Sequence, residues 1–435
     1  MKFLVRHTGK LLGEAQPPSS KSHTVRALLI AMLAKGTSRI INALDSEDTR
    51  AAMECCRRLG AEITAIKNYT GGLDIKMTSR GIPLEPIETE IYTGNSGITT
   101  TFLMPIAGLR ADAETPLKLD CGEQMKKRPL SPIIEALNRL GMEVRPIGGN
   151  ESCPVRIKGR LEGGYAKIDG INSQYLSALL LALPCAPKNS EICVSNLKER
   201  PYVDMTLDWL AKQDIRLGHF KKDKTDIYKI IGRQNYHAFE KTIPGDFSSA
   251  SYIIAAAAIL PGEVIIHGMD MDDPQGDKRL VPILQSMGAD IKIDGQDLHI
   301  HGGKPLKGMT IDCADIPDLL PTLAVIGTIA EGKTTLLNSE NARIKETDRM
   351  KSMAEELKKM GAAIEERKSS LIIRQSRLHG ALLHGHSDHR TIMALAVAGS
   401  LAAGQTEIDT AEAVDKTFPD FVGTMNSLGA DITKL

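Results

Sequence analysis

The sequence predicts an α/β protein of six repeated units, three in each of two domains, in which helices pack against sheets. Three observations support this prediction. A Gly-marked helix ending recurs along the chain, short β-branched strands alternate with Ala/Leu-rich helical patterns, and 435 residues are too many for one hydrophobic core. Two domains of about 200 residues each are the expected division.

The helix endings are spaced roughly 70 to 80 residues apart, which is the mark of an internal repeat. They are Leu59-Gly60, Leu140-Gly141, Gln213-Asp214, Met287-Gly288, Met360-Gly361 and Leu428-Gly429. Glycine is common just after a helix because it adopts the left-handed conformation at little steric cost. A short strand is expected after each ending.

Each unit has the same order of elements. Residues 252–260 fit a buried Ala/Ile-rich helix, Pro261-Gly262 ends it, and residues 263–267 alternate like a strand. A second helix follows a polar stretch. The polar region 218–242 and the Pro17-Pro18 pair mark the crossings between domains, so we predict domains of residues 21–242 and of residues 1–20 with 243–435.

Composition excludes several classes of function. The formal net charge is zero and no long basic run is present, which disfavours nucleic acid and anionic membranes as partners. The seven cysteines are odd in number and form no Cys-x-x-Cys pair, so neither a disulfide framework nor a zinc site is indicated. No signal peptide or stretch of membrane-spanning length is present, and we expect a cytoplasmic protein.

Polar residues gather first at the starts of the Ala/Leu-rich helices. These starts are residues 19–24, 94–97, 172–174, 245–249, 315–318 and 387–390. Ser, Asn and Asp are ordinary capping residues, but a helix start also binds anions. Lys21, Arg26 and Arg390 favour an anion, because a cation in the first turns opposes the helix dipole.

The second gathering place is the loop before the second helix of each unit, and residues 341–349 form the densest example. If this run is helical, Lys345 and Arg349 share a face at a spacing of four residues, with Glu346 beside them. Such a face suits a dianionic ligand together with an acid or base.

Together these motifs resemble the 5-enolpyruvylshikimate-3-phosphate (EPSP) synthase family over essentially the whole chain. They are Ser20-Lys21-Ser22 with Arg26, the loop 94–97, Lys127-Arg128-Pro129, Ser173-Gln174, residues 200–204, residues 343–349, Asp388-His389-Arg390 and residues 416–419. The resemblance implies a two-domain enolpyruvyl transferase fold, an inside-out α/β barrel of six βαβαββ-type units whose helix starts face an interdomain cleft. It also implies a monomer.

The resemblance further implies transfer of the enolpyruvyl group of phosphoenolpyruvate to the 5-hydroxyl of shikimate 3-phosphate, with release of phosphate. Phosphoenolpyruvate would be bound by Lys21, Gly97, Arg128, Gln174, Arg349, Arg390 and Lys416. Shikimate 3-phosphate would be bound by Lys21, Ser22, Arg26, Asn172, Ser173, Gln174, Tyr202, Asp318, Asn341 and Lys345. Paired charge-assisted hydrogen bonds from arginine suit a phosphate and a carboxylate.

Three residues are candidates for catalysis. Asp318 would accept the proton of the 5-hydroxyl, and Glu346 with Lys21 would handle the C3 proton and the departing phosphate. The carboxylates are flanked by Lys and Arg and do not cluster with His, so no metal and no cofactor are implied.

The chain departs from the family pattern near Gly97 and at residue 172. Ile98 stands where the family usually has Thr, and Thr101 where it usually has Arg. A branched Ile beside Gly97 predicts weakened inhibition by glyphosate, which is longer than the substrate it displaces. Asn172 replaces the first Ser of the usual Ser-Ser-Gln, and it can still donate to a phosphate.

The third departure is Glu199, which replaces a Ser that helps to bind the 3-phosphate. A carboxylate facing a phosphate would repel it. The expectation is that Glu199 turns away and pairs with Lys198, Arg200 or another cation; the alternative is a different acceptor.

Two other functions stay open at this stage. The sister enolpyruvyl transferase that acts on UDP-N-acetylglucosamine uses a loop Cys as an acid, but Cys121 follows the synthase pattern and is interpreted as a small strand-end residue. A non-enzymatic repeat protein that binds a partner would not need Lys21, Asp318, Glu346 and Lys416 together.

Overall fold

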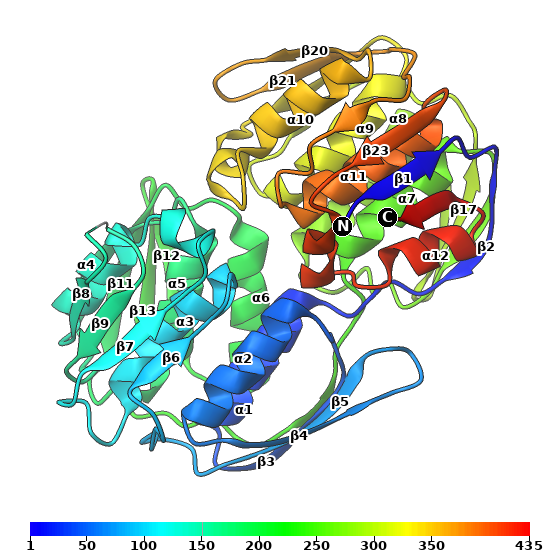
Figure 1. The fold of residues 1–435 in the computed structure, drawn as a ribbon. Helices are drawn as coiled ribbons and strands as arrows, with labels where there is room; N and C mark the ends of the chain where they lie inside the picture. Colours follow the sequence, from blue (N-terminus) through cyan, green and yellow to red (C-terminus); the bar gives the residue numbers. More distant parts are fainter. Residues whose placement is uncertain (150) are drawn as a thin grey trace. The chain divides into compact units, whose positions relative to one another are not determined.

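A computed structural model describes residues 1–149 and 151–435, and the chain divides into two compact units (Figure 1). Unit 1 comprises Met1–Pro18 and Pro244–Leu435, and unit 2 comprises Ser19–Ile243. Each unit has its own hydrophobic core.

The strands of unit 2 are β3 (Gly36–Ala43), β4 (Glu62–Lys67), β5 (Leu73–Ser79), β6 (Glu90–Tyr92), β7 (Leu117–Asp120), β8 (Glu143–Pro146), β9 (Val155–Lys158), β10 (Tyr165–Asp169), β11 (Ser190–Ser195), β12 (Leu217–Lys222), β13 (Thr225–Ile230) and β14 (Glu240–Thr242). Its helices are α1 (Lys21–Leu33), α2 (Glu47–Arg58), α3 (Gly97–Ile106), α4 (Ser131–Arg139), α5 (Ser173–Ala182) and α6 (Arg200–Ala211), with short 3-10 turns η1 (Ala107–Leu109), η2 (Met125–Lys127) and η3 (Leu183–Cys185).

The strands of unit 1 are β1 (Phe3–Arg6), β2 (Leu11–Ala15), β15 (Gly262–Ile266), β16 (Asp290–Asp294), β17 (Asp297–Gly302), β18 (Thr310–Asp312), β19 (Lys333–Leu337), β20 (Ala363–Glu366), β21 (Leu371–Arg374), β22 (Leu382–Leu383), β23 (Gln405–Ile408) and β24 (Asp431–Lys434). Its helices are α7 (Phe247–Ile259), α8 (Leu280–Met287), α9 (Leu320–Ile329), α10 (Arg349–Lys359), α11 (His389–Leu401) and α12 (Phe421–Ser427), with 3-10 turns η4 (Gly276–Arg279), η5 (Pro317–Leu319), η6 (Glu340–Ile344) and η7 (Ala411–Lys416).

The six repeats form six sheets of four strands with one common topology. In the sheet β6-β7-β9-β8, β6 pairs with β7 in parallel, and β9 lies antiparallel to both β7 and β8. Helix α3 connects the parallel pair and α4 precedes β8, which is the predicted βαβαββ order. The N-terminal segment completes two sheets of unit 1, because β1 lies between β23 and β24 and β2 pairs with β15.

The first helix of each repeat lies in the core of its unit. All ten residues of α3 are buried, and so are twelve of the thirteen in α7 and in α11. A helix that is apolar on every side must be covered on every side. Figure 1 shows α3 beside α5 in unit 2, and α7, α9 and α11 packing together in unit 1. The fold therefore has sheets outside and helices inside, as predicted.

The recurring glycines end helices in the left-handed conformation. Gly60 has φ of 99° after α2, and Gly429 has φ of 106° after α12. In the repeat that lacks the glycine, Asp214 takes φ of 57° at the same place after α6. Aspartate tolerates this region better than most residues, so the divergent ending keeps the same turn.

In the described part of the chain, no helix is long and apolar enough to cross a membrane.

Candidate active site

The predicted polar helix starts cap the buried helices. The side chains of Ser20, Ser96, Asn172, Asp246 and Asp388 each accept a hydrogen bond from a backbone N–H in the first turn, and they cap α1, α3, α5, α7 and α11. The sixth start differs, because Pro317–Leu319 forms the turn η5 ahead of α9. The capping prediction is confirmed at five of the six starts.

Arg26 of α1 is a buried cation that donates only to neutral oxygens. Its Nε donates to Thr206 Oγ1 at 2.9 Å, Nη1 to the carbonyl of Ser22 at 3.0 Å and Nη2 to the carbonyl of Tyr202 at 2.9 Å. Its guanidinium also lies over the ring of Phe102, 5.3 Å from the ring centre. Burial lowers the pKa of Arg26 to about 9. In the described chain no carboxylate pairs with this charge, which favours an anionic ligand.

Lys21, the first residue of α1, already has an anionic partner. Its Nζ lies 3.0 Å from Asp48 Oδ2 of α2, and Asp48 is buried. The sequence did not single out Asp48 as a functional residue. The acidic first turn of α2, formed by Glu47 and Asp48, was the available signal.

Gly97, Arg128 and Gln174 meet at the starts of α3 and α5. A Cβ on Gly97 would collide with Nη1 of Arg128 and would lie 3.5 Å from Oε1 of Gln174. Thr101 Oγ1 donates to the same Oε1 at 3.4 Å, and Asn172 accepts from the backbone N–H of Gln174. The structure therefore brings together three of the residues predicted to bind phosphoenolpyruvate.

Ile98 lies in the hydrophobic core of unit 2 and is 7% exposed. Its branch packs with core side chains, and weaker inhibition by glyphosate stays a prediction. Its neighbour Gly97 is the residue in contact range of Arg128.

Glu199 is directed at Ser173, a contact that the sequence did not predict. Its Oε2 accepts from Ser173 Oγ at 2.7 Å and from the Ser173 N–H at 3.4 Å, and its side chain is buried. Arg200, one of its expected partners, donates to Asp226 at 2.9 Å. The Glu199 carboxylate therefore accepts hydrogen bonds from Ser173, a residue predicted to bind shikimate 3-phosphate.

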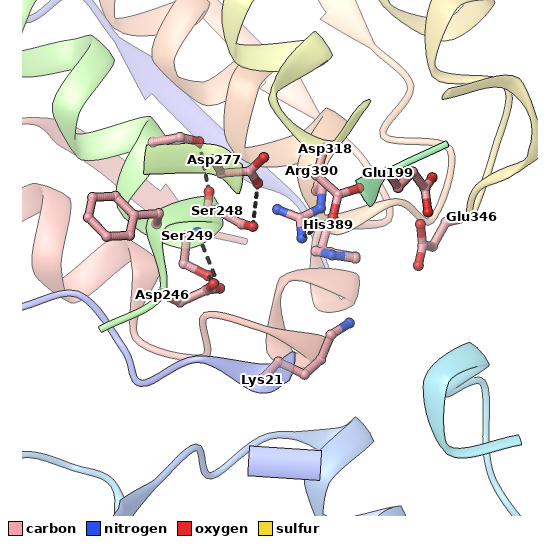
Figure 2. Close-up of polar contacts among 12 residues, drawn as sticks. Lys21, Glu199, Asp246, Ser248, Ser249, Asp277, Asp318, Glu346, His389 and Arg390 are labelled. Carbon is pink, nitrogen blue, oxygen red and sulfur yellow. Dashed lines mark hydrogen bonds and ion pairs between the residues drawn. The ribbon is translucent and has the colours of Figure 1, made fainter. Parts of the chain in front are cut away.

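In unit 1, Asp318 joins two buried arginines. Its Oδ1 pairs with Arg349 Nη1 at 2.6 Å. Its Oδ2 pairs with Arg390 Nη2 at 2.8 Å, and Figure 2 shows Asp318 beside Arg390. Burial alone would raise the pKa of Asp318, but Arg390 and Arg349 outweigh it and hold this pKa well below its usual range. Asp318 is therefore ionised at neutral pH.

Residues 345–348 are not helical, so the condition for a helix face shared by Lys345 and Arg349 is not met. The turn η6 ends at Ile344, Lys345 has φ of −86° and ψ of −149°, outside the helical region, and α10 begins only at Arg349. Asp348 explains the break, because its side chain accepts from the Lys351 N–H and caps α10. Glu346 pairs with Arg349 and so lies beside it as expected, although no helical face joins Lys345 and Arg349.

Asn341 of η6 is 2% exposed, and neither Oδ1 nor Nδ2 has a hydrogen-bond partner among the described residues. A buried amide without partners is rare in proteins and costs free energy. This amide can therefore bond to a polar ligand. Lys416, at the end of η7, is also buried, and η7 packs against α11.

Sequence reasoning did not give Asp388 and Asp277 functional roles. Asp388 caps α11, and its Oδ2 lies 2.8 Å from Arg349 Nε. Asp277 of η4 is buried and accepts from Ser248 Oγ at 2.5 Å, whereas its Oδ1 has no partner among the described residues (Figure 2). Both residues stand in polar stretches that the repeat had marked.

Replacement of Asp277 by Asn should stabilise the protein more as the pH rises. Burial and the Asp318 carboxylate raise the pKa of Asp277 from 3.8 to about 7. The unfolded chain loses this proton near pH 3.8 and the folded chain near pH 7, so the cost of folding grows between these values. In thermal unfolding, the gain for Asp277→Asn should be small at pH 4 and largest above pH 7, at roughly 2–4 °C per kcal/mol. A gain independent of pH would contradict the raised pKa.

Two groups of side chains outside these sets have the spacing of metal ligands. They are Asp120 with Cys121 and Cys153, and Glu355 with Glu356 and His386. Neither group contains a residue predicted to bind substrate. Cys121 directly follows β7 and is buried, in agreement with its interpretation as a strand-end residue.

Comparison with known proteins identifies the family. The model of the EPSP synthase (3-phosphoshikimate 1-carboxyvinyltransferase) family matches residues 5–425. A 3-phosphoshikimate 1-carboxyvinyltransferase of Acetivibrio thermocellus is 46% identical over 98% of this chain and 97% of its own length. One from Methanocaldococcus jannaschii is 41% identical over 99% of both chains.

Solved structures agree on the fold. An EPSP synthase from Acinetobacter baumannii has a TM-score of 0.80 and 24% identity, and the match covers 100% of both chains. Six like sheets around buried helices, with arginines and lysines at helix starts, define an α/β protein of the enolpyruvyl transferase class. Within that class, the chain belongs to the EPSP synthase family.

Proposed function

We propose that this protein transfers the enolpyruvyl group of phosphoenolpyruvate to the 5-hydroxyl of shikimate 3-phosphate and releases phosphate. This is the step of the shikimate pathway that leads to chorismate and the aromatic amino acids. The proposal is supported by family membership and by the chemistry of the described residues.

The buried charge of Arg26 carries the proposal. A guanidinium has five N–H groups, and three of its nitrogens here donate to neutral oxygens. The remaining N–H groups and the uncompensated charge suit a phosphate oxygen. We assign Arg26 to the 3-phosphate of the acceptor, with Ser22, Ser173 and Tyr202 nearby in unit 2.

The rest of the acceptor set follows the same reasoning. Asn341 offers an amide donor and an amide acceptor to the hydroxyls of the ring. Lys21, Asn172, Gln174, Asp318 and Lys345 complete the proposed acceptor set. The proposed phosphoenolpyruvate set is Lys21, Gly97, Arg128, Gln174, Arg349, Arg390 and Lys416.

The reaction needs three proton movements around one small group. The acceptor's 5-hydroxyl oxygen bonds to C2 of phosphoenolpyruvate and loses its proton, which we assign to Asp318, while C3 gains a proton. In the second step C3 loses a proton, the bond from C2 to the phosphate oxygen breaks, and phosphate leaves. We assign the C3 proton and the leaving phosphate to Glu346 and Lys21. Arginines near the phosphate would stabilise its charge.

We further infer that the protein is a cytoplasmic monomer of two domains, residues 21–242 and residues 1–20 with 243–435. The seven free thiols fit a reducing compartment.

The test is phosphate release by the purified protein. Phosphoenolpyruvate is supplied with shikimate 3-phosphate in one reaction and with UDP-N-acetylglucosamine in another. We expect release with the first acceptor alone. Phosphate release with UDP-N-acetylglucosamine alone would identify the activity of the sister enolpyruvyl transferase. No release with either acceptor would mean that the protein uses another acceptor or only binds a partner.

A further inference from the structure

Glu199 is an unusual residue at the start of α6. It stands at the N-cap position without a side-chain capping bond, has φ of 54° and ψ of 39°, in the left-handed region, and is 2% exposed. A glutamate in this conformation is uncommon and costs free energy, and so does a buried carboxylate. Such a residue persists where the surrounding contacts hold it.

One residue that holds it is Ser173, the first residue of α5. Glu199 Oε2 accepts from the Ser173 hydroxyl at 2.7 Å and from the Ser173 backbone N–H at 3.4 Å. A serine hydroxyl has one proton, so the Ser173 proton donated to Glu199 cannot be donated to a second anion. Glu199 thus occupies the anion-binding end of α5.

The same part of unit 2 contains the proposed phosphate contacts. Tyr202 lies three residues after Glu199 on α6, and its carbonyl accepts from Arg26 at 2.9 Å. Arg26 has an uncompensated charge, whereas the Ser173 donors already face a carboxylate. Of the residues assigned to the 3-phosphate, Arg26 therefore has no anionic partner in the described chain, whereas Ser173 already bonds to a carboxylate of the protein itself.

We propose that Glu199 is a specificity-determining residue, whose carboxylate competes with the acceptor's 3-phosphate for Ser173 and lowers the preference for the phosphorylated acceptor over unphosphorylated shikimate. The inference rests on the proposed function. When shikimate 3-phosphate binds, the phosphate either displaces the carboxylate from Ser173 or binds beside it against like charge. Shikimate has no such charge, so its affinity does not carry this cost.

The test uses two variants. Glu199→Gln removes the charge and keeps the side-chain length, and Glu199→Asn shortens the side chain while tolerating the left-handed conformation. The dissociation constant of shikimate 3-phosphate, measured by calorimetry without phosphoenolpyruvate, should fall about tenfold in both variants. The dissociation constant of shikimate should change less than about twofold, so the ratio of the two dissociation constants changes.

Glu162→Gln is the matched control, because Glu162 is a partly exposed glutamate of unit 2 that pairs with Lys188. It removes the same charge and should leave both constants unchanged. Unchanged or weaker binding of shikimate 3-phosphate in both Glu199 variants, with melting temperatures like wild type, would overturn the proposal. A change of the same size for both ligands would also overturn it, because a structural role has that effect.

The outcome is separable from a failure of the proposed function. Wild-type protein that neither binds shikimate 3-phosphate nor releases phosphate contradicts the proposed activity. Wild-type protein that does both, with variants that keep the wild-type ratio of constants, contradicts only the role of Glu199.

Discussion

Asp318→Asn should reduce kcat by about 10²- to 10⁴-fold, the usual range for the loss of a general acid or base. The carboxylate of Asp318 is held ionised between Arg349 and Arg390, so at neutral pH it is in the form that a proton acceptor requires. An amide of the same shape cannot accept that proton. The measurement is single-turnover formation of the enolpyruvyl product with both substrates saturating.

Asp388→Asn is the control variant that distinguishes the loss of a proton acceptor from the loss of a negative charge beside the arginines. Asp388 also pairs with Arg349, at 2.8 Å from Nε, and asparagine at this position keeps the cap of α11. Both variants remove one negative charge from the arginine pair, but only Asp318 has a proposed part in proton transfer. We expect a much smaller loss of kcat for Asp388→Asn. Equal losses would show that Asp318 acts only as a counter-ion.

The fold was predictable because the residues that mark the start and end of each helix lie close to that helix in the sequence. Gly60 and Gly429 marked the helix ends, and the divergent Asp214 kept the same left-handed turn. Capping by Ser20 and Asp388 was also readable, because a cap bonds to its own first turn. Local signals of this kind require no knowledge of distant residues.

The partners of the charged residues were not predictable in the same way. The pairing of Asp388 with Arg349 joins residues 39 apart in sequence, and that of Asp277 with Ser248 joins residues 29 apart. The spacing of Lys345 and Arg349 gives a shared face only if residues 345–349 are helical, and this condition is not met. The cap at Asp348 starts the helix later. Charge density located the site, but spacing alone did not give its geometry.

Arg26→Met should abolish most of the affinity for shikimate 3-phosphate without destabilising the fold. Hydrogen bonds to charged groups contribute about 1.5–3 kcal/mol each, so the dissociation constant should rise at least 10- to 100-fold. Methionine fills a similar volume and removes a buried charge whose described hydrogen bonds all go to neutral oxygens. Buried charges replaced in this way often leave stability unchanged or raise it. Calorimetry with shikimate 3-phosphate and thermal unfolding measure the two effects.

Arg110→Met is the control for burial of an arginine in the same unit. Arg110 is 3% exposed and donates to the carbonyls of Thr115 and Ile157, and burial lowers its pKa as it lowers that of Arg26. It differs in that the nearby Asp112 carboxylate favours its charged form. Its replacement should leave the affinity for shikimate 3-phosphate unchanged. If Arg26→Met bound as tightly as this control, the charge of Arg26 would not face the phosphate, and the observation that carries the proposed function would lose its force.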